Sequence, residues 1–434
     1  MSTEHLPHDG ATEGASERAA ELASQRLCLG LVAGSVLLLV VLAAWLVPWS
    51  WVPGGHLVDV PADEVFSAAQ LRRSETYASM QRHLGWASLA VSLVVALVLG
   101  LTPLGSGLAR RMRGPWWVRA LATTLVILVV GVLVTAPFAL MARSNALEYG
   151  LTNQSLTGWL RDRGVSLLVS WVFSGVLVLL VIGTARRSPR RWPLWTALAG
   201  VVLTLVGSWV YPVLVEPLFN QFTSLPRGEL RTEVLELARK EKVPVSDVLV
   251  ADASRRTTTL NAYVSGFGST RRVVLYDNLV DDVPRRETLS VVAHELGHAR
   301  NHDVLLGTGL GAVGVGVGCG LLGLVLSRRR LLERAGVDGP GQPEVVALLL
   351  ALVAVGSLLA SPFQNTVSRA IEARADRAAL SATGDYRAFE EVQAQLAKRS
   401  LSDDDPPWLS QFWFGSHPTT LQRIGLARAL EERR

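Results

Sequence analysis

The sequence predicts a mainly α-helical integral membrane protein, with about seven transmembrane helices and a polar domain of helices plus a small β-sheet. Its 434 residues are 49% hydrophobic and 18% charged, whereas soluble domains carry roughly 25% charged residues. Apolar runs approaching or exceeding the roughly 20 residues that cross a bilayer recur along the chain. The net charge of +5 comes with arginines placed in short loops between these runs, which is typical of membrane topology and not of nucleic-acid binding.

The apolar runs define the domain organisation. Residues 1–27 are polar, without apolar periodicity, and we expect a disordered tail there. Residues 28–215 contain five expected spans, and residues 304–361 contain two more. The spans cover Leu27 to Val47, 84–104, 117–141, 164–185, 193–215, 304–326 and 344–361. Tryptophans at their ends fit an aromatic belt at the membrane surface.

Two polar regions separate and follow the last spans. Residues 216–303 predict an amphipathic helix from Pro226 to Lys242, short strands at 248–250 and 273–276, and an extended segment at 261–265. Pro284 suits the first turn of a further helix. Residues 362–434 are again helical, broken by a loop at 403–407.

The helix after Pro284 carries an H-E-x-x-H motif, made by His294, Glu295 and His298. Two histidines four residues apart share one helix face and can bind one metal ion, while the glutamate acts on a metal-bound water. The chain has only two cysteines, both inside apolar runs, so a metal must be held by histidine and carboxylate. This pattern predicts one Zn²⁺ per chain and a peptide-hydrolysing site.

A catalytic zinc needs a third protein ligand and an open position. A histidine at the spacing H-E-x-x-H-x-x-G-x-x-H is excluded, because Asn301 and Val304 occupy the two decisive positions. Glu372 is the better candidate, and Asp376 lies one turn later on the same helix face, where it would accept a hydrogen bond from a ligand histidine. The alternative is an ordinary charged helix with arginine–glutamate pairs.

Taken together, the motifs resemble the type I CAAX prenyl proteases, which are integral-membrane zinc endopeptidases. The likeness lies in five spans, H-E-L-G-H, two further spans, and then S-R-x-x-E-x-x-A-D at residues 368–376. This resemblance implies that His294, His298 and Glu372 bind zinc. It also implies that Glu295 is the general base and acid, and that Asp376 supports the ligands from outside.

Two more segments carry the resemblance. Asn261, Ala262 and Tyr263 match the family's substrate-binding strand, and Ser416-His417-Pro418 followed by Arg423 matches its C-terminal histidine motif. The match implies that His417 stabilises the oxyanion and that Arg423 has a supporting role. From the residues alone, a lone histidine near zinc could supply such a donor, or be a loop histidine. The extended segment could add a peptide strand, or be an ordinary edge.

We therefore expect a substrate that is a peptide or membrane protein, membrane-associated or partly unfolded, with prenylated polypeptides included. The arginine distribution predicts a multi-pass protein of the cell membrane with a cytoplasmic N-terminus and an extracytoplasmic catalytic face. Eukaryotic members of the family face the cytosol, which conflicts with this count; we follow the arginines of this chain. Those in the even-numbered loops are Arg110, Arg111, Arg113, Arg119, Arg186, Arg187, Arg190, Arg191, Arg328, Arg329, Arg330 and Arg334.

Several alternatives remain open at this point. An intramembrane site-2-type protease would bury H-E-x-x-H in a membrane helix, but here Arg285, Arg286 and Glu287 precede it. Heat-shock membrane proteases share both motifs with fewer leading spans. A scaffold or metal transporter is disfavoured because the spans hold almost no ionisable residues. A G-x-G-x-x-G string at 309–314 predicts helix packing through Gly307/Gly311 and Gly314/Gly318, and not nucleotide binding.

Overall fold

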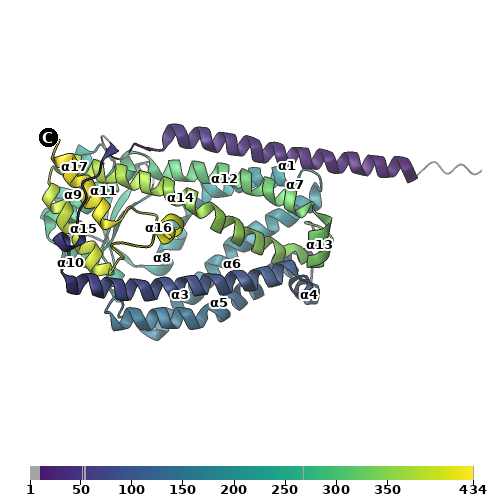
Figure 1. Cartoon of the computed structure of the whole chain (residues 1–434), viewed down its shortest axis with the longest axis horizontal. Helices are drawn as coiled ribbons and strands as arrows, with labels where there is room; N and C mark the ends of the chain where they lie inside the picture. The colour runs from purple at the N-terminus through teal and green to yellow at the C-terminus, as the bar shows by residue number, and fades with distance from the viewer. Residues whose placement is uncertain (1–9, 51, 53–54, 267, 434) are drawn as a thin grey trace, which may run out of the picture.

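The computed structural model describes residues 10–50, 52, 55–266 and 268–433, and it confirms the membrane architecture (Figure 1). Among these residues, seven helices are long and apolar enough to cross a bilayer. They are α1 (Gly10–Leu46), α3 (Ala68–Leu101), α5 (Trp116–Glu148), α6 (Leu156–Arg187), α7 (Trp192–Val210), α12 (Asp303–Leu326) and α14 (Val346–Thr383). The candidate span of α1 begins at Glu21, and that of α14 includes the preceding turn, Pro343–Val345. The span of α7 continues through a π-turn, Tyr211–Val215, and α8 (Glu216–Phe219).

The N-terminal boundary differs from the expected one. Residues 1–9 of the predicted disordered tail lie outside the described residues, but helix α1 already begins at Gly10 and not near residue 27. The segment before the apolar run is rich in alanine, glutamate and arginine, which have high helix propensity, so the helix extends beyond the bilayer-spanning part. Helix α3 likewise begins at Ala68, well before the predicted span at 84–104.

The chain segregates its connections to the two ends of the helix bundle. Helices α4 (Pro103–Arg111) and α13 (Arg329–Ala335) lie together at one end of the bundle (Figure 1). At the other end gather α9 (Glu229–Lys240), α10 (Asp277–Asp282), α11 (Arg285–Arg300), α15 (Tyr386–Ser400) and α17 (Thr420–Glu431). Arg110 Nη1 donates to the Gly336 carbonyl at 2.9 Å, and Arg186 Nη1 donates to the Gly341 carbonyl at 3.1 Å. The arginine-rich loops therefore share the end opposite the polar regions.

A four-stranded sheet organises the first polar region. Its order is β1-β2-β4-β3, with β2 and β4 parallel and the two outer pairs antiparallel. The strands are β1 (Phe222–Ser224), β2 (Asp247–Ala251), β3 (Ala262–Ser265) and β4 (Arg272–Tyr276). The two predicted strands and the extended segment are confirmed, whereas β1 was not predicted. Strand β3 forms an edge of the sheet.

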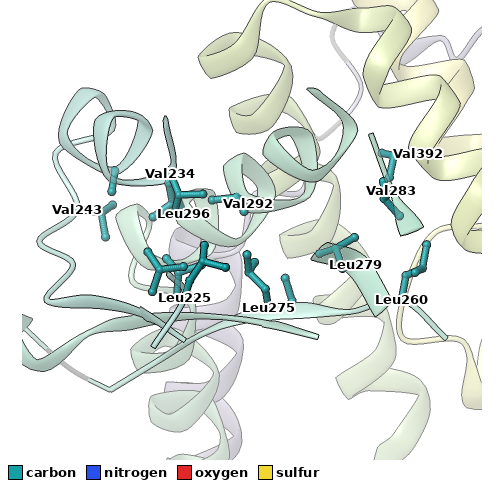
Figure 2. Close-up of a cluster of buried hydrophobic side chains, with 14 residues drawn as sticks. Leu225, Val234, Val243, Leu260, Leu275, Leu279, Val283, Val292, Leu296 and Val392 are labelled. Atoms are coloured by element: carbon teal, nitrogen blue, oxygen red, sulfur yellow. The ribbon is translucent and has the colours of Figure 1, made fainter. Parts of the chain in front are cut away.

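Helices cover this sheet and bury its core. Helix α9 (Glu229–Lys240), α10 (Asp277–Asp282) and α11 (Arg285–Arg300) contribute to one apolar cluster, joined by α15 (Tyr386–Ser400). In Figure 2, Val292 and Leu296 of α11 lie above Leu275 of β4, and all three side chains are fully buried. Since Val292 and Leu296 are one turn apart, α11 uses one face for the sheet and presents the other to α14.

Close contact between α11 and α14 depends on the glycine of the H-E-L-G-H motif. A Cβ atom at Gly297 would lie 2.9 Å from the Ala378 Cβ and 3.3 Å from the Ala375 carbonyl oxygen. Neither neighbour is the end of a flexible side chain, so a larger residue would push the helices apart. The small side chains at 375 and 378 of α14 therefore allow both helices to bring polar groups within bonding distance.

The packing prediction for α12 was wrong in position. Added Cβ atoms at Gly307, Gly311, Gly314 and Gly318 would meet nothing within 4 Å, whereas one at Gly320 would lie 2.6 Å from Val32 Cγ2 of α1. The stripe that approaches α1 starts instead at Gly316 and continues through Gly320. Because small residues occur on every face of α12, their spacing does not identify the contact face.

Candidate metal centre

The three predicted ligands converge at the contact between α11 and α14. The Nε2 atoms of His294 and His298 are 3.1 Å apart, and they lie 3.2 and 3.6 Å from the two carboxylate oxygens of Glu372. One donor atom from each residue fits within a group 4.8 Å across. The structure thus gathers two imidazoles and one carboxylate from segments on either side of a membrane hairpin formed by α12 and α14.

The hydrogen bonds of the two histidines determine which nitrogen faces the centre. His294 Nδ1 lies 2.8 Å from Asp376 Oδ1, and His298 Nδ1 lies 2.9 Å from Asp303 Oδ2. Each Nδ1 therefore carries a proton that it donates to a carboxylate, and each Nε2 presents a lone pair. Two lone pairs facing each other at 3.1 Å repel unless a cation accepts both.

Glu372 supports the same interpretation. Its residue surface is 9% exposed, and its buried Oε2 lies 3.2 Å from His294 Nε2. Burial opposes a charge on His294, but the neighbouring carboxylates of Asp376 and Glu372 outweigh burial and raise the pKa of His294 to about 10. The pocket thus demands positive charge, which a metal ion at Nε2 would supply. Two histidines and one glutamate fit a metal with one open position.

Asp376 lies where the sequence analysis expected a partner for a ligand histidine. It is fully buried, and Arg423 of helix α17 (Thr420–Glu431) binds it through two nitrogens: Nη2 at 2.5 Å from Oδ1 and Nε at 2.9 Å from Oδ2. Arg423 Nη2 is also 3.3 Å from His294 Nδ1. Because a two-pronged guanidinium holds a carboxylate in one orientation, Arg423 fixes the direction of the Asp376–His294 hydrogen bond.

The partner of the second histidine was not predicted from the sequence. Asp303 is buried at the start of α12, where it accepts from His298 Nδ1 and forms an ion pair with Arg374 of α14. His302 precedes it with φ of 56°, in the left-handed region, and turns the chain sharply between α11 and α12. That turn brings Asp303 back to His298. No periodicity in the local sequence predicts this contact.

The predicted catalytic side chains lie at the edge of this cluster. Glu295 is half-buried beside both histidines; burial raises the pKa of Glu295, against the opposing effect of His294 and His298. His417 Nε2 lies 3.3 Å from Glu372 Oε1, and its side chain is 59% exposed. Glu295 and His417 therefore both lie beside the candidate ligands.

The predicted substrate strand borders the centre. Strand β3 packs against α11 and pairs with β4, with Tyr263 opposite Val274. Asn261 precedes the strand and accepts from the Tyr276 N–H at 3.0 Å, while Ala262 is buried. Within the described part of the chain, the other edge of β3 pairs with no strand. Burial, and next the charge of Glu216, raise the pKa of Tyr263.

A separate cavity of about 500 Å³ lies away from the metal ligands. It is apolar and open to the surface, between the middle of α3 and the segment around α16 (Trp408–Phe414). Arg82 and Asp403 form an ion pair beside it. The residues lining it are Ala78, Arg82, Gly85, Trp86, Leu89, Asp403, Pro406, Ser410 and Phe414.

The fold and site define a multi-pass membrane metalloprotease. Residues 224–432 match the model of peptidase family M48, and residues 55–221 match that of the CAAX prenyl protease N-terminal region with five membrane helices. Together these matches cover most of the chain, which belongs to the CAAX prenyl protease family of M48 peptidases. Helix α11 is not one of the seven candidate spans in the described residues, which argues against the intramembrane alternative.

Individual relatives agree with this assignment. An uncharacterized metalloprotease of Bacillus subtilis, YhfN, is 28% identical over 82% of this chain and 85% of its own length. The CAAX prenyl protease 1 homolog of Oryza sativa is 31% identical over 66% of each chain. The crystal structure of S. mikatae Ste24p has the same fold, with a TM-score of 0.76 at 19% identity, covering 94% of this chain and 99% of that one.

Proposed function

We propose that this protein is a zinc-dependent endopeptidase acting at the membrane surface, with one Zn²⁺ held by His294, His298 and Glu372. The observation that carries the proposal is the pair of Nε2 atoms at 3.1 Å whose Nδ1 partners are both carboxylates. Nitrogen and carboxylate ligands in a three-residue set with one open position suit zinc in hydrolytic sites. Such an ion would acidify a water molecule and polarise the scissile carbonyl.

The protein's own residues would manage the protons and the developing charge. Glu295 takes a proton from the attacking water, whose oxygen forms the new bond to the carbonyl carbon. The same carboxyl later delivers that proton to the leaving amine as the C–N bond breaks. Burial raises the pKa of Glu295, which brings this carboxyl closer to the range where it can both accept and donate.

His417 would act on the carbonyl oxygen. Its imidazole stands beside Glu372 on the exposed side of the cluster, so a donor there meets the oxygen as negative charge develops. Asp376, Arg423 and Asp303 keep the two ligand imidazoles in the orientation described above. None of these three residues is expected to exchange protons with the substrate.

The substrate class follows from the strand edge and the membrane location. Strand β3 lies against α11, and one of its edges pairs with no strand among the described residues, which suits an extended polypeptide bound by strand addition through the segment of Asn261, Ala262 and Tyr263. We propose membrane-associated or partly unfolded polypeptides as substrates. Relatives carry the name CAAX prenyl protease, and prenylated polypeptides are accordingly a class to be tested.

We also propose that the catalytic end faces away from the cytoplasm of the cell membrane. The arginine-rich loops share the opposite end, and the positive-inside rule places that end in the cytoplasm. The native cysteines are both buried, so a single Ser188→Cys variant gives a clean labelling position in the loop between α6 and α7. We expect labelling by an impermeant maleimide only after permeabilisation; labelling in intact cells would reverse the assignment.

The decisive functional test compares membrane proteins cleaved by wild type and by Glu295→Gln, with zinc measured in both. The variant keeps all three ligands and should retain zinc while losing cleavage. Glu229→Gln is a matched control, since Glu229 is 82% exposed and pairs with Arg285 far from the ligands. Cleavage that persists in purified Glu295→Gln at the wild-type rate would overturn the proposed function.

A further inference from the structure

We infer that Arg369 is a positioning residue for His417, holding the segment after α16 so that the imidazole faces the metal centre. This inference rests on the proposed function, because it assumes that His417 acts on the substrate. Arg369 lies on α14 one turn before Glu372, so both project from the same side of that helix. The same helix would then supply a metal ligand and fix the position of the oxyanion donor.

The contacts of Arg369 are directed at backbone carbonyls. Its Nη1 donates to the Gly415 carbonyl at 2.5 Å and to the Gln411 carbonyl at 3.1 Å, while Nη2 donates to Thr366 Oγ1 at 2.9 Å. Among the described residues, no carboxylate lies within 4.0 Å of its guanidinium. An arginine whose N–H groups donate to backbone carbonyls positions the backbone and does not neutralise a carboxylate.

The segment that Arg369 holds leads directly to His417. Gly415 ends α16, and the Gln411 side chain donates from Nε2 to the His417 carbonyl at 2.8 Å. Arg369 therefore binds the carbonyl of Gln411 while the side chain of Gln411 binds the carbonyl of His417. The His417 side chain itself is 59% exposed, and its nitrogens contact Ser416 and Glu372. Its position depends on the backbone rather than on surrounding packing.

Other contacts anchor the last turn of α16 but do not reach Gly415. Ser361 Oγ and Asn365 Nδ2 both donate to the Trp413 carbonyl at 2.5 Å, and Trp413 Nε1 donates to the Leu358 carbonyl at 3.0 Å. These bonds fix the last turn of α16 against α14. Arg369 also binds the Gly415 carbonyl, which lies beyond α16 and two residues before His417, so its loss would free the imidazole without detaching α16.

The first test is kinetic. Arg369→Gln should lower kcat about 10- to 100-fold with KM and zinc content unchanged, because removing one oxyanion donor outright costs about 10²–10³ in kcat. Arg369→Lys should lose less, since its ammonium can still donate to these carbonyls but lacks the second nitrogen that binds Thr366. Arg329→Gln is the matched control: Arg329 is 91% exposed at the opposite end and should leave activity unchanged.

A double-mutant cycle separates positioning from a merely structural role. In a His417→Ala background, Arg369→Gln should cause no further loss of kcat, because the group it positions is gone. A further loss in that background would overturn the inference while leaving the peptidase proposal intact. A fall in zinc content in Arg369→Gln would also overturn it, since the defect would then lie in the metal site.

Hydrogen exchange tests the inference independently of activity. Arg369→Gln should speed amide exchange over residues 411–417 and leave α11 unchanged, whereas Asn365→Ala should affect the last turn of α16, around Trp413, more than Gly415. Unchanged exchange over 411–417 would overturn the inference whatever the kinetics show. Should Glu295→Gln remain active, the peptidase proposal fails, and exchange still decides whether Arg369 holds this segment.

Discussion

Removing the Asp303 carboxylate is expected to weaken metal binding without touching a metal ligand. Asp303 accepts from His298 Nδ1 at 2.9 Å, and its side chain is 5% exposed, so no water replaces it easily. In Asp303→Ala, the His298 ring loses the partner that fixes its orientation, and Arg374 loses its ion-pair partner. Loss of such a supporting carboxylate typically lowers metal affinity about 10- to 100-fold, or about 1.4 to 2.8 kcal/mol.

The Asp303→Asn variant should show an intermediate loss of zinc affinity. Asp303→Asn keeps an oxygen that accepts from His298 but loses the negative charge facing Arg374, so its affinity should fall less than that of Asp303→Ala. Zinc affinity is measured by competition with a fluorescent chelator on purified protein in detergent. Asp282→Asn is the control, because Asp282 forms a half-exposed pair with Arg399 on the outer side of α10.

One outcome would refute the proposed role of Asp303 in zinc binding. If Asp303→Ala binds zinc as tightly as wild type while remaining folded, the His298–Asp303 contact does not orient a ligand. A loss of affinity equal in Asp303→Asn and Asp282→Asn would point instead to general loosening of the fold. Only a graded loss, largest in Asp303→Ala and absent in Asp282→Asn, agrees with the geometry.

Two further predictions concern packing and protonation. Gly297→Val should lose zinc and lower Tm by several degrees, since even a Cβ there would lie 2.9 Å from the Ala378 Cβ. Normal zinc content in this variant would show that α11 and α14 can move apart without disturbing the metal site. Asp404→Asn should raise Tm more at pH 7.5 than at pH 5, because burial, and next Asp403, raise the pKa of Asp404 to about 6. The folded state then favours the protonated carboxyl, so the wild-type protein loses folding stability as pH rises from about 4 through 6. An uncharged amide at this position causes no such loss. An equal change in Tm at both pH values would contradict the prediction.

Local patterns predicted much of this architecture. Apolar run length predicted seven spans, because crossing a bilayer requires a length that few other structures need. The H-E-x-x-H spacing predicted two imidazoles on one face of α11, which the 3.1 Å distance between their Nε2 atoms bears out. Glu372 could be predicted only by combining its stretch with the family resemblance, since charged helices are common.

The remaining features depend on contacts between distant segments. Asp303 reaches His298 because His302 adopts a left-handed backbone conformation. The presence of a histidine in the sequence does not predict that conformation. Arg369 binds carbonyls that belong to residues 42 and 46 positions later, and backbone acceptors have no sequence signature. The stripe of α12 that meets α1 was mispredicted for a related reason: small residues on all faces leave the rotation of the helix to its neighbours.

The central claim is that a metal site is completed across the α12–α14 hairpin, by Glu372 joining the two histidines of α11. Zinc content per chain, measured by mass spectrometry after dialysis, tests this most directly in wild type, Glu372→Gln and Glu295→Gln. The claim predicts about one zinc in wild type and in Glu295→Gln, and far less than one in Glu372→Gln, since catalytic zinc needs three protein ligands. Full, equally tight zinc in Glu372→Gln would contradict it.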